Sequence, residues 1–152
     1  MLNTPLLSRP SIVALAGGAL SYAVLYWLST SGAVAFSHWW FHATSTNDLQ
    51  NQIANSPTFT FISVGLIFSH QLVPGFIAGI LARRSGLMHG FLTSALLPFV
   101  QLSFLFREFL LAPSLVIQTL VITLFLGLLL SSIAGVAGEI VASRLWPHAR
   151  RA

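Results

Sequence analysis

The chain contains no cysteine and no lysine, and acidic residues occupy only three of its 152 positions. Without cysteine it can form neither a disulfide nor a thiolate metal site, and it has no cysteine nucleophile. Charged residues make up 7% of the chain, whereas a soluble domain carries about 25%. This scarcity of charge excludes a surface that is mostly in water. The net charge of +4 therefore does not predict a nucleic-acid partner.

The sequence also lacks the common motifs of catalysis. We find no nucleophile elbow, phosphate-binding loop, paired-carboxylate site or zinc motif. Ser69 precedes His70 directly, but adjacent helical residues point about 100° apart, so the two cannot form a dyad. His38 and His42 share a helical spacing, yet zinc would need a third ligand, and Trp39 stands where a zincin has glutamate. We therefore predict that the chain is not an enzyme and binds no metal.

What the chain does contain is long uncharged apolar segments. About 20 apolar residues suffice to cross the hydrocarbon core of a bilayer. The sequence predicts four membrane spans, at about residues 11–29, 58–82, 86–106 and 115–142. The expected fold is all-α, a single transmembrane domain (1–152) folded as a four-helix bundle. Residues 30–57 would form an outer loop, with a short surface helix within residues 47–55.

The arginines predict the orientation of this bundle. Cytoplasmic loops of membrane proteins are enriched in arginine and lysine. If both termini lie in the cytoplasm, six of the seven arginines lie on that side. These six are Arg9, Arg83, Arg84, Arg144, Arg150 and Arg151. We therefore expect a multi-pass protein of a cell inner membrane, although Ala33-Val34-Ala35 is also a possible signal-peptidase site.

Small residues recur at four-residue spacing in the first, second and fourth predicted spans. Membrane helices associate by close packing, which small residues permit. The predicted packing positions are Gly75, Ala78, Gly79, Ala82, Gly135 and Gly138. This pattern is typical of contacts within a bundle, and the alternative is a contact with another subunit.

His70 is the most unusual residue of the second span, because ionisable groups are costly inside a membrane. Pro74 removes the usual backbone donor to the His70 carbonyl, so we expect a kink between the two residues. The predicted polar site comprises Ser69, His70, Gln71 and Gln101. Its alternatives are a structural hydrogen bond from His70 to Gln101 or to a hydroxyl, a transport site, and a haem or pigment ligand at His70.

A second group of polar residues is expected at the cytoplasmic side. Glu139 lies near the end of the fourth span, where a half-buried carboxylate needs a partner. Arg83, Arg84 and His89 are predicted on the same side. This charge cluster is expected to be a structural clamp, with proton coupling as the alternative.

From Gly75 to Gly90 the chain reads G-x-x-A-G-x-x-A-x-x-x-G-x-x-H-G. This stretch resembles the hairpin of small uncharacterised bacterial inner-membrane proteins with four predicted helices. The segment AGVAGEIVASRL of the fourth span is similar to their closing helix. The resemblance implies a bacterial inner membrane and a four-helix architecture, and it implies no mechanism.

Taken together, these patterns favour a non-enzymatic structural or accessory subunit of a larger membrane complex or homo-oligomer. Its partners would be membrane lipids and other membrane subunits. One alternative is a small-solute or ion transport component that uses His70 and Pro74. Another is a cofactor-binding or lipid-binding subunit with His70 as the ligand. An exposed glycine stripe would favour the first function, and a polar cavity at His70 the second.

Overall fold

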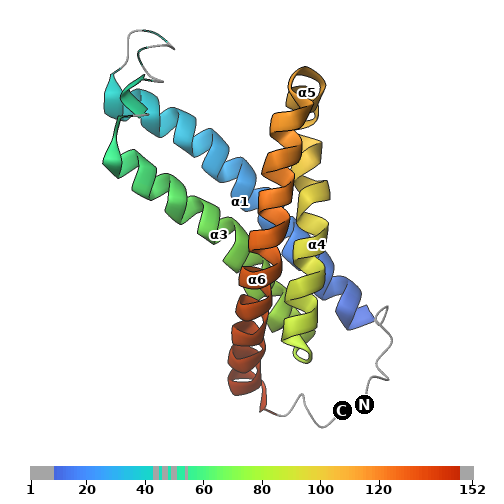
Figure 1. Cartoon of the computed structure of the whole chain (residues 1–152). Helices are drawn as coiled ribbons and strands as arrows, with labels where there is room; N and C mark the ends of the chain where they lie inside the picture. The colour runs from blue at the N-terminus through green and yellow to red at the C-terminus, as the bar shows by residue number, and fades with distance from the viewer. Residues whose placement is uncertain (1–8, 43–44, 46–47, 49–50, 54, 148–152) are drawn as a thin grey trace.

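The computed structural model describes residues 9–42, 45, 48, 51–53 and 55–147, and all regular secondary structure in this part is helical. The helices are α1 (Arg9–Phe41), α3 (Pro57–Ala82), α4 (Gly86–Phe104), α5 (Phe106–Leu111) and α6 (Pro113–Leu145) (Figure 1). α1, α3, α4 and α6 are each long and apolar enough to cross a membrane. The prediction of an all-α chain with four candidate spans is therefore confirmed.

The boundaries of α3 follow from local chemistry. The Ser56 hydroxyl accepts a hydrogen bond from the backbone N–H of Phe59 at 3.2 Å, and Pro57 occupies the first helical position, where its missing N–H costs nothing. The helix ends at Arg83, which adopts a left-handed conformation with φ 57°. Ser85 is also left-handed, with φ 56°. Two such residues reverse the chain within the three residues that join α3 to α4.

Two boundaries differ from those expected. α1 continues to Phe41 instead of ending near Ser29, and residues 30–41 contain no proline that would break an apolar helix. The prediction that residues 30–57 are all loop is therefore wrong for residues 30–41. The third span ends at Phe104 and is followed by the unexpected short helix α5. Within the predicted surface helix at residues 47–55, Asp48 and residues 51–53 are helical, and residues 47, 49, 50 and 54 lie outside the described residues.

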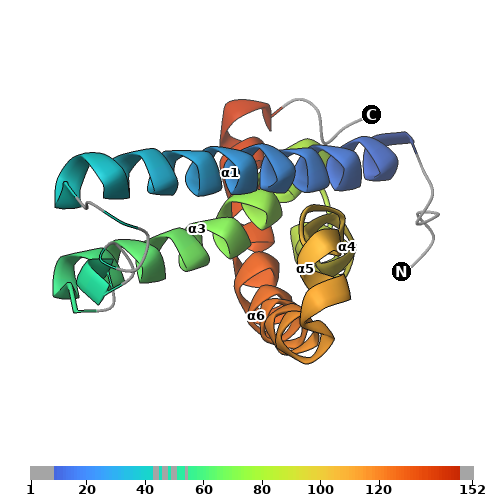
Figure 2. The ribbon, with the colours of Figure 1, turned by 90° about the horizontal axis from the view of Figure 1, so that it is seen from above.

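The helices form two antiparallel pairs that cross each other. α4 and α6 lie side by side and are joined by α5, while α1 lies along α3 (Figure 1). α3 also packs on α4 and α6, whereas the described residues of α1 contact α3 and α4 but not α6. Seen from above, α1 and α3 run across the axes of α4 and α6 (Figure 2).

The two pairs are close at one end of the molecule and apart at the other. We call the end that holds the α3–α4 turn the base, and the end that holds α5 the open end. At the base all four helices are near one another, and at the open end the α1–α3 pair points away from α4 and α6 (Figures 1 and 2). α1 and α6 have 33 residues each and are therefore about 50 Å long. Such helices must tilt or project beyond a hydrocarbon core of about 30 Å.

Candidate functional site

The base is held together by close contact between helix backbones. A Cβ atom on Gly79 would overlap the carbonyl oxygen of Gly135, and one on Gly75 would overlap that of Ser131. The same two carbonyls also face α4, where Gly86 lies against Gly135 and Gly90 lies against Ser131. We call these residues the glycine seam: Gly75, Gly79, Gly86, Gly90, Ser131 and Gly135. Each of two α6 carbonyls thus touches one glycine of α3 and one of α4.

This seam accounts for the small residues that the sequence singled out. Gly138 lies against the carbonyl of Phe76, Ala78 is fully buried, and Ala82 is half-buried. Nothing in the sequence indicated that Gly86 and Gly90 face α6. Carbonyl oxygens that lie directly against a glycine of a neighbouring helix favour weak Cα–H···O contacts. These contacts add to the close packing of the helices.

The seam glycines all contact other helices of the same chain and are not exposed for contact with another subunit. Gly18 of α1 is also internal, since it packs against Thr93 and the carbonyl of Pro74. Only Gly32 and Gly65 have no neighbouring atom within 4 Å of a built Cβ, and a single glycine on a helix is not a stripe. An exposed glycine stripe for binding another subunit is therefore not found among the described residues.

Buried and half-buried polar side chains follow the seam residues along α3 and α4, toward the open end. We call this group the polar layer: His70 and Gln71 of α3, and Thr93, Ser94 and Gln101 of α4. Gln71 is one turn from Gly75, and its amide oxygen lies next to Gly127 of α6, whose missing Cβ leaves the space that the amide occupies. The hydroxyl of Ser131 donates to the backbone carbonyl of Gln71 at 2.5 Å.

Three oxygens of the polar layer have no hydrogen-bond partner within the described residues. They are Gln71 Oε1, Thr93 Oγ1 and Gln101 Oε1. Their side chains are 3%, 0% and 6% exposed, respectively. A buried polar atom without a partner costs about 1–3 kcal/mol, and such atoms are rare in native proteins. This part of the bundle therefore contains buried oxygens whose hydrogen-bonding capacity is not satisfied by the described residues.

His70 lies at the edge of the polar layer and is turned toward α1. The hydroxyl of Ser29 donates to the Leu25 carbonyl at 2.7 Å, so its oxygen is free to accept a proton from His70 Nε2, which is 2.7 Å away. The partner of His70 is thus a hydroxyl of α1 and not Gln101.

The structure also bears on the cofactor hypothesis for His70, on Ser69 and on the expected kink at Pro74. The ring centroids of Tyr22 and Tyr26 each lie 5.8 Å from that of His70, so a haem or pigment held by His70 would have to displace these rings or break the bond to Ser29. Ser69 donates to the Gly65 carbonyl of its own helix at 2.8 Å and does not join the polar layer. α3 remains one continuous helix through Pro74. The described residues contain no group of three potential metal ligands.

Three residues of the expected charge cluster, Glu139, Arg83 and His89, each contact a different partner. Glu139 Oε2 accepts a hydrogen bond from the backbone N–H of Gly86 at 2.7 Å. The Arg83 guanidinium lies 5.3 Å from the centre of the Trp146 ring, and the His89 ring contacts the carbonyl of Ser85 at 3.0 Å. Arg84 is exposed. Glu139 therefore caps the first turn of α4 in place of Ser85, whose side chain makes no capping bond.

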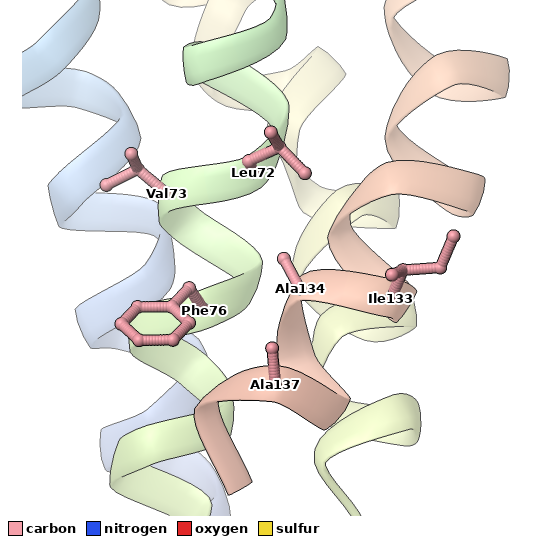
Figure 3. A pocket seen from close by; sticks show the side chains of 6 residues that line it. All are labelled: Leu72, Val73, Phe76, Ile133, Ala134 and Ala137. Carbon is pink, nitrogen blue, oxygen red and sulfur yellow. The ribbon is translucent and has the colours of Figure 1, made fainter. Parts of the chain in front are cut away.

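Two apolar hollows complete the surface. A groove of about 340 Å³ lies between α3 and α6 (Figure 3), and a smaller one of about 210 Å³ lies between α1 and α3. The larger is lined by Leu72, Val73, Phe76, Ile133, Ala134 and Ala137. The smaller is lined by Ser29, Gly32, Phe36, Phe59, Ile62, Ser63 and Leu66. Neither groove has a charged group in its lining, so both are suited to hydrocarbon and not to a charged ligand.

Comparison with protein-family models, with curated proteins and with solved structures finds no match to this chain.

Proposed function

We propose that the chain is a non-enzymatic, multi-pass protein of the bacterial inner membrane that acts as an accessory subunit of a larger membrane complex or homo-oligomer. In this proposal the base is a rigid core, and the open end receives a transmembrane helix of the partner between the two helix pairs. The close backbone contacts of the glycine seam support the first part, since they join α3, α4 and α6 into one unit. The second part rests on the exposure of α3.

A single stripe of α3 carries this proposal. Its residues follow each other at spacings of three and four and so lie on one helix face. They are Phe61, Val64, Phe68, Gln71, Gly75 and Ala78. Gln71 and Ala78 are 3% and 0% exposed, whereas Phe61, Val64 and Phe68 are 81%, 45% and 45% exposed. The face that contacts α4 and α6 at the base thus continues toward the open end as large uncovered apolar side chains.

The α1–α3 pair supports a protein partner over lipid at this face. At the open end these two helices point away from α4 and α6 (Figure 1), and the 210 Å³ groove lies between them. Lipid gives no hydrophobic gain to helix association, so an isolated helix pair is stable in a membrane only through its packing. A third helix against the α3 stripe would add packing to the pair where α3 has no neighbour but α1.

The arginines support the orientation. Arg9 begins α1, Arg83 and Arg84 lie in the α3–α4 turn, and Arg144 is near the end of α6. All of these segments are at the base (Figure 1). We propose that the base faces the cytoplasm, with both chain termini on that side, because positive residues are retained there.

Site-specific photo-crosslinking tests the subunit role. A photoreactive phenylalanine analogue at position 61 is expected to give a discrete protein adduct in native membranes, whose mass distinguishes a second copy from another subunit. Phe99 is the matched control, because it is 73% exposed on the side of α4 opposite to the buried residues Leu97 and Gln101. The proposal is wrong if position 61 gives only lipid adducts, as expected for position 99.

A further inference from the structure

We infer that the groove between α3 and α6 holds an acyl chain of an anionic phospholipid, whose phosphate group is bound by Arg83 at the base. This site differs from the α3 stripe of the proposed function, since the α3 residues that line the groove are Leu72, Val73 and Phe76. The inference requires that the chain spans a membrane. It depends neither on the subunit role nor on the side that the base faces.

The groove is formed by small side chains of α6 next to large side chains of α3. Figure 3 shows Ala134 and Ala137 on one wall and Leu72 and Phe76 on the other. The groove has a volume of about 340 Å³, and all its lining residues are apolar. Ala137 is exposed, so the groove opens to the surroundings of the helices. Such a lining suits a hydrocarbon chain, because none of its side chains can form a hydrogen bond with a ligand.

Both walls of the groove lead to an arginine at the base. The contacts of the glycine seam pair α3 with α6 in increasing residue order, so the two helices run in the same direction. Arg83 follows Phe76 by seven residues at the end of α3, and Arg144 follows Ala137 by seven residues in α6. Residues at this spacing lie on one helix face, two turns apart. Each wall therefore continues along its own face to a cation.

The ends of the two walls are also in contact with each other. The Arg83 guanidinium lies 5.3 Å from the centre of the Trp146 ring, and Trp146 directly follows the last residue of α6. A cation–π contact leaves the N–H groups of the guanidinium available to phosphate oxygens, which bind it with paired hydrogen bonds. Tryptophan is enriched at the depth of the lipid headgroups. The Trp146 ring thus holds a phosphate-binding cation at the base, beside the end of α6.

The spacing of these residues along α3 matches one leaflet of a bilayer. At 1.5 Å per residue, Phe76 is about 10 Å and Leu72 about 16 Å from Arg83 along the helix. Half of the hydrocarbon core is about 15 Å thick. With Arg83 at the level of the phosphates, the groove therefore lies in the hydrocarbon of the same leaflet. One lipid can reach both the groove and the arginine.

The charge of the base favours an anionic headgroup. Three arginines lie there: Arg83, Arg84 and Arg144. Of the three acidic residues of the chain, only Glu139 belongs to α3, α4 or α6, and its carboxylate accepts a hydrogen bond from a backbone N–H of α4. The arginines thus outnumber the carboxylate, and basic clusters at headgroup depth attract anionic lipids.

Lipid binding to the purified full-length chain tests the headgroup part. Native mass spectrometry in mild detergent compares phosphatidylglycerol with phosphatidylcholine of identical acyl chains. Phosphatidylglycerol is expected to bind at least about tenfold more tightly, since each arginine near an anionic lipid contributes roughly fivefold in affinity. Arg83→Gln should lower this preference roughly fivefold, and addition of Arg144→Gln should lower it further. Both side chains are exposed, so the variants should fold.

Arg107→Gln is the control, because Arg107 lies in α5 at the open end, and it should leave the preference unchanged. Equal affinity for the two lipids in the unaltered protein would overturn the inference. So would a preference that survives in the double variant.

Ala137→Phe tests the groove, because the new ring occupies the space of the acyl chain. It is expected to weaken the binding of both lipids by the same factor and to keep the preference between them. Ala16→Phe is the matched control, since Ala16 is exposed on α1, and it should not change either affinity. Glycerol phosphate, which has no acyl chain, should not compete with phosphatidylglycerol.

Three outcomes would contradict the groove part. Competition by glycerol phosphate would show that the arginines bind phosphate without an acyl chain. Equal lipid affinities of the two phenylalanine variants would show that the chain lies elsewhere. Loss of a co-purifying protein from Ala137→Phe with lipid binding unchanged would show that a partner helix occupies the groove in place of a lipid.

Discussion

At the scale of single residues, glycines that look alike in the sequence have opposite surroundings. Gly65 and Gly79 both lie in α3, yet a Cβ on Gly65 would meet nothing within 4 Å and one on Gly79 would overlap the Gly135 carbonyl. A backbone carbonyl cannot move aside as a flexible side chain can. The same substitution should therefore have opposite effects at the two positions.

Gly79→Ala should separate α3 from α6 and prevent recovery of a folded monodisperse protein, or lower its melting temperature by more than about 4 °C. Gly65→Ala should raise stability slightly, since alanine is better than glycine in a helix by about 0.5–1 kcal/mol. Size-exclusion chromatography and thermal unfolding in mild detergent measure both effects. Equal behaviour of the two variants would contradict the glycine seam.

The bond between His70 and Ser29 should be measurable as a coupling energy. A double-mutant cycle of Ser29→Ala and His70→Phe is expected to give about 0.5–1.5 kcal/mol, because each single change removes the same 2.7 Å bond. Ser69→Ala serves as the control. Its hydroxyl bonds to its own helix, so it should show no coupling to His70, and coupling through Ser69 in place of Ser29 would refute the assignment.

At the scale of elements, the start of α4 depends on a residue 53 positions away in the chain. Ser85 precedes α4 but makes no side-chain cap, and Glu139 of α6 accepts from the backbone N–H of Gly86 in its place. A negative charge at a helix N-terminus is favourable by about 0.3–1 kcal/mol. Glu139 therefore joins the two helices electrostatically as well as by packing.

Glu139→Leu should destabilise the protein by about 1–3 kcal/mol, because the Gly86 N–H loses a charged acceptor. Glu139→Gln keeps an acceptor oxygen and should cost less. Hydrogen exchange at the first turn of α4 is expected to accelerate in the order Glu, Gln, Leu. A leucine variant with unchanged exchange at Gly86 would show that the contact has no role in capping.

At the scale of the whole molecule, the proposed topology has four spans and therefore both chain ends on one side of the membrane. Because the chain has no native cysteine, single cysteines report accessibility without background. Ser45→Cys, in the connection between α1 and α3, should react with an impermeant thiol reagent in intact cells, and Ala152→Cys should react only after lysis. Labelling at position 152 in intact cells would reverse the proposed orientation.

The sequence alone determined the helical class and the four candidate spans, because charge is excluded from hydrocarbon wherever the partners lie. It also indicated Gly75, Gly79, Gly135 and Gly138 as packing positions, because small side chains are needed wherever membrane helices meet closely. Local capping signals were sufficient for the start of α3 at Ser56 and Pro57. The helical class, the spans, the packing positions and the helix cap all depend on residues close in sequence and on the surrounding lipid or water.

Only the tertiary structure decided which partner each residue meets. Gly86 and Gly90 face α6, His70 meets Ser29, and Glu139 reaches Gly86, all across distances in the chain that no periodicity encodes. The crossing of the two helix pairs likewise decides that Gln71 is buried while Phe68, one turn earlier, is exposed. A helix carries the same pattern along its whole length, and the angle at which it meets its neighbours determines which part of that pattern is covered.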